Sequence, residues 1–212
     1  TPLVEAVQHG ERLGDSFSIS EGLKSGKNER FIRFWQEVSK VNTGKFGLGL
    51  KWVPHAKGGN YRRWYGNGLW VVNWADDGRE IKDFKSSGLQ GHSNYGSLGV
   101  TWSKISTSYF GVRQQAPGAI FDSAAPGLFP TAEMSALQVL SLLSSSSAAE
   151  FVKSLNPTLN IQVGNIASIP LPDGTEWRSG AETLGTEAVA LSRADWDAFE
   201  RSWDFQCLPI LR

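Results

Sequence analysis

Apolar and polar positions divide the chain into stretches with the period of strands and stretches with the period of helices. From about 46 to 122, short apolar runs such as LGLKWVP, LWVVNW, LGVTWS, YFGVR and AIFD alternate with Gly, Asn, Ser and Pro. Apolar runs of this length, bounded by turn residues, are typical of strands. The middle of the chain is therefore predicted to be mostly β-sheet.

Helical spacing appears on both sides of this region. NERFIRFWQEVSK (28–40) repeats apolar residues at i, i+3, i+4 and i+7 behind Asn28 as a candidate N-cap, which predicts a short helix. Its aromatic and β-branched content also suits a strand. PTAEMSALQVLSLLS (130–144), capped by Thr131, and a second helix from Ser147 to Leu155, stopped by Asn156-Pro157, predict a helical hairpin joined by a serine turn.

The last part of the chain is predicted to be extended from 159 to 172, polar and irregular to about 190, and helical from Ser192, with Trp196, Phe199 and Trp203 on one face. Together the patterns indicate an α+β fold. We expect one domain over residues 1–212, built on a mixed or antiparallel twisted sheet with the helical hairpin and flanking helices.

Composition narrows the class of protein. No run approaches the roughly 20 apolar residues of a membrane helix. The single cysteine, Cys207, rules out an internal disulfide framework, and together with the lack of a secretion-signal pattern it favours a reducing, cytoplasmic setting. A start at Thr1 rather than Met indicates a piece of a longer chain.

Charge is balanced overall, with 21 cations and 21 acids, but it is unevenly distributed. Residues 24–63 hold ten Lys and Arg, among them Lys51, against two acids, a balance of +8. Residues 173–204 hold three Arg against eight acids, a balance of −5. A basic half facing a polyanion, with the acidic half turned away, is the expected arrangement.

The stretch KGGNYRRWYGNGLWVVNW (57–74) combines cations, glycines and large rings. Cations neutralise phosphates, Asn and Arg read base edges, and aromatic rings stack on bases or brace a loop, so residues 57–65 favour nucleic acid as partner. The alternating Trp70, Val72 and Trp74 are expected to fill a sheet core instead. The hydroxyl-rich GVTWSKISTSYFGVR (99–113) suits phosphate contacts and ordinary turns equally well.

Catalytic motifs are incomplete. GLKSGK (22–27) is one residue short of a phosphate loop, and His9, His55 and His92 are too scattered to indicate a metal site. The acids of NWADDGREI, namely Asp76, Asp77 and Glu80, could form an acid and base pair, but Asp-Asp-Gly between apolar runs favours a hairpin turn. An independent enzyme is therefore the weakest of the hypotheses.

Five segments, in this order, resemble a known family: EGLKSGKNERFIRFW, KWVPHAKGGNYRRWYGN with VVNWADDGREI, GVTWSKISTSYFGVR, LNPTLNIQVGNIASIPL and SRADWDAFERSWDF. They are similar to the C-terminal specificity region of PglX-type adenine-specific DNA methyltransferases from BREX phage-defence systems, a TaqI-like target recognition domain. The resemblance covers about 17 to 208. It implies that a separate domain, absent here, binds S-adenosylmethionine and the extruded adenine. This chain alone would then need no cofactor and would not methylate.

The resemblance also implies three recognition loops, at 25–28, 57–67 and 101–104. Trp64, Tyr65 and Trp102 are expected to support these loops. Together with Lys51 and Asn60, the residues expected to contact double-stranded DNA are Ser25, Lys27, Asn28, Lys57, Gly58, Gly59, Arg62, Arg63, Asn67, Thr101, Ser103 and Lys104.

Further partners follow from the same resemblance: the protein's own methyltransferase domain, other BREX proteins, and phage inhibitors that mimic DNA, for which a basic surface would be suitable. The alternative hypothesis is a carbohydrate- or protein-binding module, because nine tryptophans would also provide an aromatic platform. Salt-insensitive glycan binding would favour that alternative.

Overall fold

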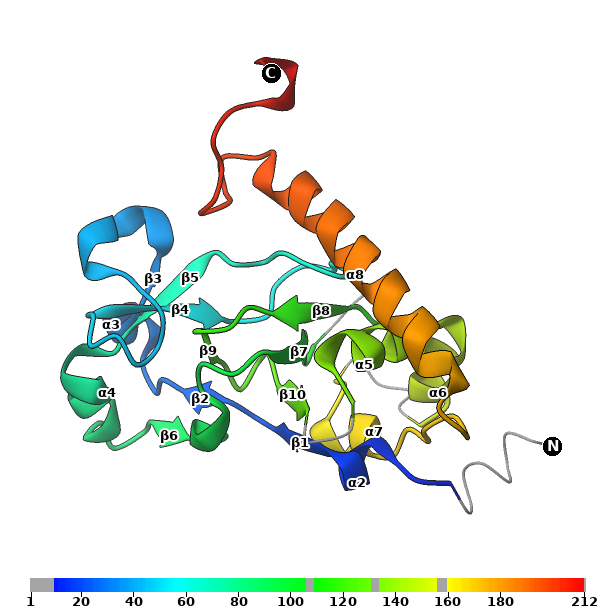
Figure 1. The fold of residues 1–212 in the computed structure, drawn as a ribbon. Coiled ribbons are helices and arrows are strands. Elements are labelled where there is room, and N and C mark those ends of the chain that lie inside the picture. The colour runs from blue at the N-terminus through cyan, green and yellow to red at the C-terminus, as the bar shows by residue number, and fades with distance from the viewer. Residues whose placement is uncertain (1–9, 106–108, 131–133, 156–159, 212) are drawn as a thin grey trace.

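The structure is a computed structural model that describes residues 10–105, 109–130, 134–155 and 160–211. Its strands lie in two four-stranded sheets and one two-stranded sheet (Figure 1). The first sheet is antiparallel throughout, in the order β1-β10-β7-β8. Its strands are β1 (Phe17–Ser20), β10 (Gly127–Pro130), β7 (Gly99–Trp102) and β8 (Val112–Gln115).

The second sheet has the order β3-β5-β4-β9, and β9 joins β4 in parallel with His55 opposite Ile120. Its strands are β3 (Ile32–Phe34), β5 (Trp70–Asn73), β4 (Trp52–Ala56) and β9 (Ile120–Phe121), while β2 (Leu23–Lys24) pairs with β6 (Gly88–Leu89). Antiparallel and mixed sheets with separate helices confirm the α+β fold class.

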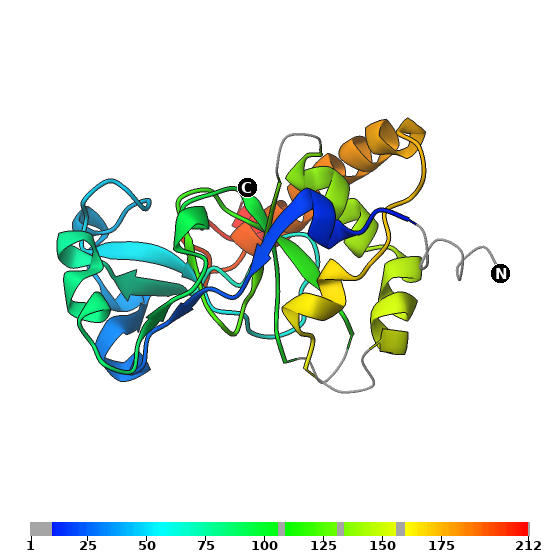
Figure 2. The same cartoon turned by 90° about the horizontal axis from the view of Figure 1, so that it is seen from below.

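Helices gather around each sheet. The helices of residues 28–31 and 75–82 lie beside the second sheet, the other helices lie on the side of the first sheet, and from below the two sheets lie in separate halves of the molecule (Figure 2). The helices are α2 (Leu13–Ser16), α3 (Asn28–Phe31), α4 (Ala75–Lys82), α5 (Ala136–Leu143), α6 (Ser146–Leu155), α7 (Val163–Ala167) and α8 (Glu176–Asp197).

Each half has its own apolar core. In the first half, Trp102, Val112 and Leu128 of the sheet pack with Leu140 of α5. In the second, Val53 and Val72 pack with residues such as Phe121. Phe129 of β10, in the first sheet, belongs to the second core, and its ring centroid lies 4.9 Å from that of Phe121. Within the described residues, no helix is long and apolar enough to cross a membrane.

The helix predicted over 28–40 is wrong for most of its length. Helix α3 covers only Asn28–Phe31, and Ile32–Phe34 then form strand β3. These residues pair with β5, and Phe34 stacks on Trp70 with ring centroids 4.0 Å apart. Strand pairing therefore overrides a helical spacing that contained many strand-forming residues.

The helical hairpin starts later than predicted in its first helix. Helix α5 begins at Ala136, with Ser135 as its N-cap: the Gln138 N–H donates to Ser135 Oγ at 3.2 Å. Helix α6 begins at Ser146, and Ser145 Oγ accepts from the Ala148 N–H at 3.1 Å, in place of the cap predicted at Ser147. Thr131 and the Asn156-Pro157 stop lie outside the described residues.

Two predictions for the end of the chain are wrong. The stretch 159–172 contains helix α7, where Gln162 and Asn165 form a capping box and Ile166 is buried. Helix α8 starts at Glu176 instead of Ser192 and ends at Asp197, so Phe199 and Trp203 lie beyond it. Gly185 lies inside α8 because a Cβ there would come within 2.7 Å of the Leu137 carbonyl oxygen on α5. A residue that usually weakens helices here permits two helices to cross closely.

Candidate nucleic-acid interface

The first predicted loop, 25–28, is buried and hydrogen-bonded at Ser25 and exposed over its remaining residues. The Ser25 hydroxyl is buried and donates to Asn28 Oδ1 at 2.6 Å. Gly26 has φ +72°, and a Cβ there would come within 2.7 Å of the Ser86 carbonyl carbon. Lys27 and the rest of Asn28 face solvent. Of this loop, Lys27 is the side chain best placed to reach a ligand.

The second predicted loop, 57–67, is shaped by backbone conformations that few residues adopt. Gly58, Gly59 and Gly66 have positive φ, and so do Trp64 and Asn67. The side chain of Asn67 closes the loop by donating to the Asn60 carbonyl oxygen at 2.8 Å. The glycines therefore give the segment a fixed shape instead of leaving it free.

Trp64 attaches this loop to the first sheet. Its N–H donates to the Val112 carbonyl oxygen at 3.0 Å, and its carbonyl oxygen accepts from the Gln114 N–H at 2.8 Å. Its ring and that of Tyr65 pack against the core of the first half. Trp102, which is fully buried, donates from Nε1 to the Ile161 carbonyl oxygen at 3.1 Å. These contacts are those that a loop-supporting role requires.

Gly66 gives a direct test of the loop's shape. It has φ +118°, and a Cβ would come within 2.9 Å of the Trp196 ring. We expect Gly66→Ala to lower the free energy of unfolding by about 1–3 kcal/mol because of backbone strain and this clash. Urea denaturation measures the change. Gly68→Ala is the matched control, since a Cβ at Gly68 would have no atom of the described residues within 4 Å. Equal losses of unfolding free energy in both variants would contradict the role given to Gly66.

Several predicted DNA-contacting cations form internal contacts. Arg62 Nη1 lies 3.1 Å from Asp195 Oδ2, and its guanidinium covers the Trp196 ring at 4.6 Å. Lys104 pairs with Glu21. Arg63 is half-buried, and its Nε has no hydrogen-bond partner among the described residues. Arg62 therefore holds the loop on α8, and its contact with DNA stays a prediction.

The hydroxyls of the third loop, 101–104, are also used within the fold. Thr101 Oγ1 lies 2.9 Å from the carbonyl oxygen of Pro126, and Ser103 Oγ donates to the carbonyl oxygen of Gly59 at 2.8 Å. Ser103 thereby connects the third loop to the second. The two loops form one structure, in which a change in either is expected to shift the other.

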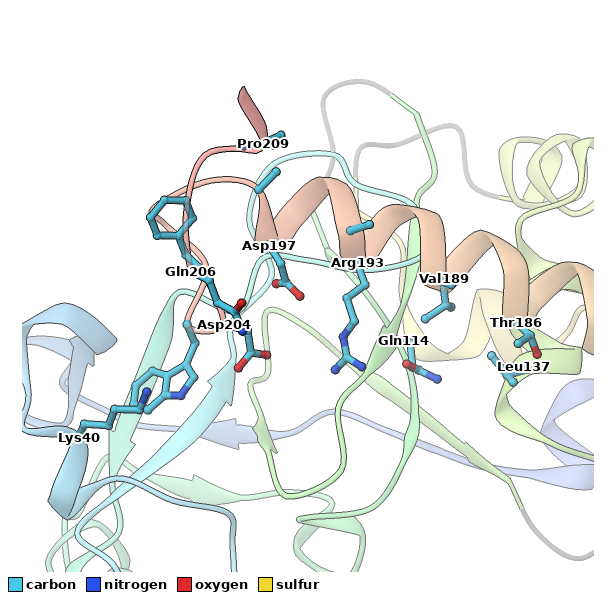
Figure 3. A pocket seen from close by; sticks show the side chains of 15 residues that line it. Lys40, Gln114, Leu137, Thr186, Val189, Arg193, Asp197, Asp204, Gln206 and Pro209 are labelled. Carbon is cyan, nitrogen blue, oxygen red and sulfur yellow. The ribbon is translucent and has the colours of Figure 1, made fainter. Parts of the chain in front are cut away.

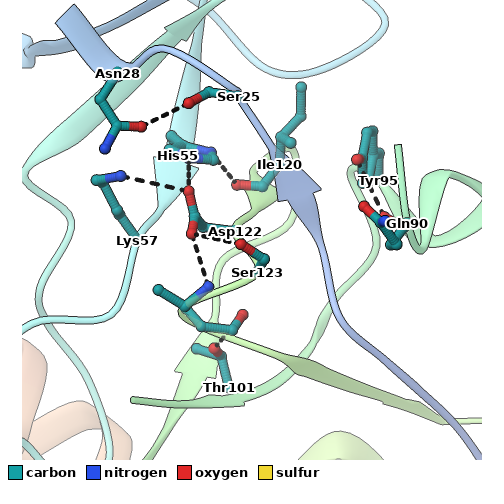
Figure 4. Close-up of polar contacts among 12 residues, drawn as sticks. Ser25, Asn28, His55, Lys57, Gln90, Tyr95, Thr101, Ile120, Asp122 and Ser123 are labelled. Carbon is teal, nitrogen blue, oxygen red and sulfur yellow. Dashed lines mark hydrogen bonds and ion pairs between the residues drawn. The ribbon is translucent and has the colours of Figure 1, made fainter. Parts of the chain in front are cut away.

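A buried polar pair that the sequence did not reveal lies behind these loops. His55 Nε2 is 2.9 Å from Asp122 Oδ2, and His55 Nδ1 is 3.0 Å from the Ile120 carbonyl oxygen (Figure 4). Lys57 Nζ, predicted to contact DNA, lies 3.6 Å from the same carboxylate. His55 and Asp122 are 67 positions apart. No local spacing could have connected them.

Asp122 is held in its charged form. Burial alone would raise its pKa, but the hydrogen bonds from His55 and the Ala124 N–H, with the charges of His55 and Lys57, outweigh burial and hold the pKa below the ordinary value of an aspartate. This cluster joins β4 to the segment after β9. It therefore fixes the start of the second loop at Lys57.

A cleft of about 530 Å³ opens between the two sheets, the second loop and the segment after α8. Its floor holds the buried His55 and Arg113, and its outer part holds the exposed Lys40 and Lys45. Five Lys and Arg residues line it, and Asp204 is the only Asp or Glu among its described lining residues. Like charges in a low-dielectric cleft concentrate a positive potential. The cations of the cleft are Lys40, Lys45, Lys57, Arg113 and Arg193.

A second groove of about 940 Å³ runs beneath α8 and shares Arg193 and Gln114 with this cleft. Figure 3 shows Arg193 pointing from the helix toward Gln114, with Lys40 on the opposite side of the groove. Arg193 also lies over the Tyr65 ring at 4.7 Å. Helix α8, most of which was predicted to be irregular, thus supplies one wall of the candidate site.

The acids considered for catalysis lie elsewhere, on the surface. Asp76 pairs with Arg79 at 2.9 Å, and Asp77 Oδ2 lies 2.6 Å from Lys82 Nζ, whose hydrogen bond lowers the pKa of Asp77. None of these acids lines either groove. The left-handed φ of Asp76, Asp77 and Gly78 forms a turn that leads into the rest of α4, so the predicted hairpin turn between strands is wrong. In the described residues, no group of three His, Cys, Asp or Glu could hold a metal ion.

The chain is homologous to adenine-specific methyltransferases and corresponds to a segment of them. It is 32% identical over 216 residues to PglX of Lacticaseibacillus casei (strain Zhang), an alignment that covers 95% of this chain and 18% of that protein. It is 33% identical over 184 residues to BrxX of Escherichia coli O9:H4 (strain HS), covering 85% of this chain and 15% of that protein. The chain spans less than a fifth of the length of these relatives. A comparison with models of protein families finds no match.

Proposed function

We propose that this chain recognises a short site in double-stranded DNA and directs N6-adenine methylation by a separate S-adenosylmethionine-dependent domain, in BREX-type phage defence. The relatives are described as adenine-specific methyltransferases, and a segment covering under a fifth of their length is too short to contain every part of such a protein. The proposal treats the chain as a single cytoplasmic recognition domain without catalysis of its own.

The observation that carries this proposal is the cationic cleft. Lys40 and Lys45 are exposed, line the same cleft and form no ion pair with any described residue. Both can therefore neutralise phosphates without breaking an ion pair, although Lys40 Nζ also lies 5.6 Å from the centroid of the Trp203 ring. Exposed Asn60 and Lys27, on the first two loops, offer further polar groups. Phosphate contacts would position the duplex, and base contacts from the loops would select its sequence.

The test is duplex binding by Lys40→Glu/Lys45→Glu. Each phosphate contact contributes to the salt dependence of affinity, so we expect at least a tenfold loss at low salt and a salt slope smaller by about 2. Fluorescence anisotropy of a labelled duplex pool at several salt concentrations measures both quantities.

The matched control is Lys85→Glu/Lys153→Glu. Both of these lysines are exposed and neither lines a groove, yet the variant has the same net charge. Equal loss in the two variants would mean that only total charge matters, and unchanged affinity in the cleft variant would remove the proposed surface.

A carbohydrate- or protein-binding module is the second candidate, favoured by the rings of Trp35, Trp70 and Trp203 in the same cleft. Aromatic platforms bind apolar faces with little dependence on salt. Binding of a glycan that is unaffected by Lys40→Glu/Lys45→Glu and abolished by Trp203→Ala would favour this candidate over DNA recognition.

A further inference from the structure

Arg113 is a buried cation without a counter-ion. It is 2% exposed, and no carboxylate of the described residues lies within 4 Å of it. Its guanidinium nitrogens come no closer than 3.4 and 3.5 Å to Ser103 Oγ, which is longer than a good hydrogen bond. Burial lowers the pKa of Arg113 to about 10, which still leaves it protonated at neutral pH.

Gln115 has an unused acceptor on the same strand face. It is 1% exposed, its Oε1 has no hydrogen-bond partner in the part of the chain that the structure describes, and its Nε2 lies 3.5 Å from the Ser97 carbonyl oxygen. Residues two apart on a strand point to the same side of the sheet. Both Arg113 and Gln115 line the inter-sheet cleft. Its floor thus offers weakly bonded Arg113 donors beside an unsatisfied acceptor of Gln115.

Buried polar groups are ordinarily hydrogen-bonded, so an unpartnered acceptor beside a buried cation that has only long hydrogen bonds and no ion pair points to a ligand. A nucleobase edge presents acceptors beside a donor, and Arg and Gln are side chains that read such edges. The cleft volume of about 530 Å³ lies within the range of small-molecule sites.

The walls and the outer part of the cleft suit the rest of a nucleotide. Trp35 and Trp203 are half-buried and meet edge to face, with ring centroids 5.2 Å apart, and both line the cleft with Trp70. Base stacking on such rings is general for unpaired nucleotides. Lys40 and Lys45, exposed farther out, can take the phosphate.

We propose that the inter-sheet cleft binds a single unpaired nucleotide, with its base edge on Arg113 and Gln115, its ring among the tryptophans and its phosphate at Lys40 and Lys45. The nucleotide can come from solution or from a nucleotide extruded from a DNA strand. Binding of a free nucleotide does not require that the chain bind a duplex, so this inference goes beyond the proposed function.

Calorimetric titration of the chain with each of the four 2′-deoxynucleoside 5′-monophosphates tests the site. We expect saturable binding of at least one of them, weakened at least tenfold by Arg113→Met and by Gln115→Leu. Because each substitution removes a buried polar group that has only long hydrogen bonds, neither is expected to lower the melting temperature. If Arg113→Met does not fold, the loss of nucleotide binding in Gln115→Leu still tests the site.

The affinity for a duplex with one bulged nucleotide, compared with the affinity for its fully paired counterpart, distinguishes a nucleotide extruded from DNA from a free nucleotide. Tighter binding of the bulged duplex, lost in Gln115→Leu, with no binding of free nucleotides, would assign the site to an extruded nucleotide. Absence of both signals, or binding unchanged in Arg113→Met and Gln115→Leu, would overturn the inference. Duplex affinity in Lys40→Glu/Lys45→Glu is read separately, so failure here is distinct from failure of the proposed function.

Discussion

Asp122→Ala is expected to lower the free energy of unfolding by about 3–5 kcal/mol, because it leaves the buried His55 without its charged acceptor. Asp122 is 5% exposed and accepts from His55 Nε2 at 2.9 Å and from the Ala124 N–H at 2.7 Å. His55 is 2% exposed and cannot turn to water instead. Denaturation by urea, monitored by tryptophan fluorescence, measures the change.

Asp77→Ala is the control for this substitution. Its carboxylate pairs with Lys82 at 2.6 Å but is 75% exposed, so removing it is expected to cost no more than about 1 kcal/mol. The loss of unfolding free energy should therefore be several times larger for Asp122→Ala than for Asp77→Ala. Similar losses in Asp122→Ala and Asp77→Ala would contradict the role assigned to the buried cluster.

The carboxylate of Asp122 also makes the free energy of unfolding depend on pH. Since the pKa of Asp122 is lower in the folded chain than the ordinary value of about 3.9, its contribution is fully present above that value and is lost as pH falls toward the folded pKa. Wild type should therefore lose stability below about pH 4 more steeply than Asp122→Asn. Parallel acid profiles in the two proteins would show that Asp122 does not contribute.

Local patterns in the sequence predicted the elements that carry a continuous apolar run or a capped helical spacing. Strands β4, β5, β7 and β9 coincide with the apolar runs of 46–122, and helices α5 and α6 with capped helical spacing. Most of helix α8 was not predicted, because Gly180 and Gly185 lie within it and few apolar residues repeat along one face. The reason for Gly185 lies on α5, at the Leu137 carbonyl oxygen, which no local reading reveals.

The sequence also predicted only part of the candidate site. The resemblance and the local chemistry indicated which loops to consider, and the cations of 24–63 are indeed dense there. The sequence could not predict which cations form ion pairs within the fold. Arg62 is paired with an acid 133 positions away, and Lys104 with one 83 positions away. The sequence placed Arg113 in a segment that suits phosphate contacts, but it gave no sign that Arg113 is buried without an ion pair or that Gln115 Oε1 is buried without a partner in the described residues.

Trp102→Ala is the second substitution with a large expected effect. Trp102 is 0% exposed on β7, packs with Val112 and Leu140, and donates from Nε1 to the Ile161 carbonyl oxygen. Removing a fully buried tryptophan creates a cavity that costs about 3–5 kcal/mol of unfolding free energy. Because Ser103 follows it and bonds to Gly59, we also expect weaker duplex binding through a displaced second loop.

Trp102→Phe separates these two effects. Most of the apolar volume remains while the hydrogen bond to Ile161 is lost, so the expected cost falls to about 1–3 kcal/mol, mainly from the unpaired carbonyl oxygen. If Trp102 supports the loops by packing, Trp102→Phe keeps duplex affinity near wild type at a temperature where Trp102→Ala has lost it, although both remain folded by circular dichroism. A loss of affinity in Trp102→Phe equal to that in Trp102→Ala would show that the position of Ile161, held by the indole N–H, matters more than the ring.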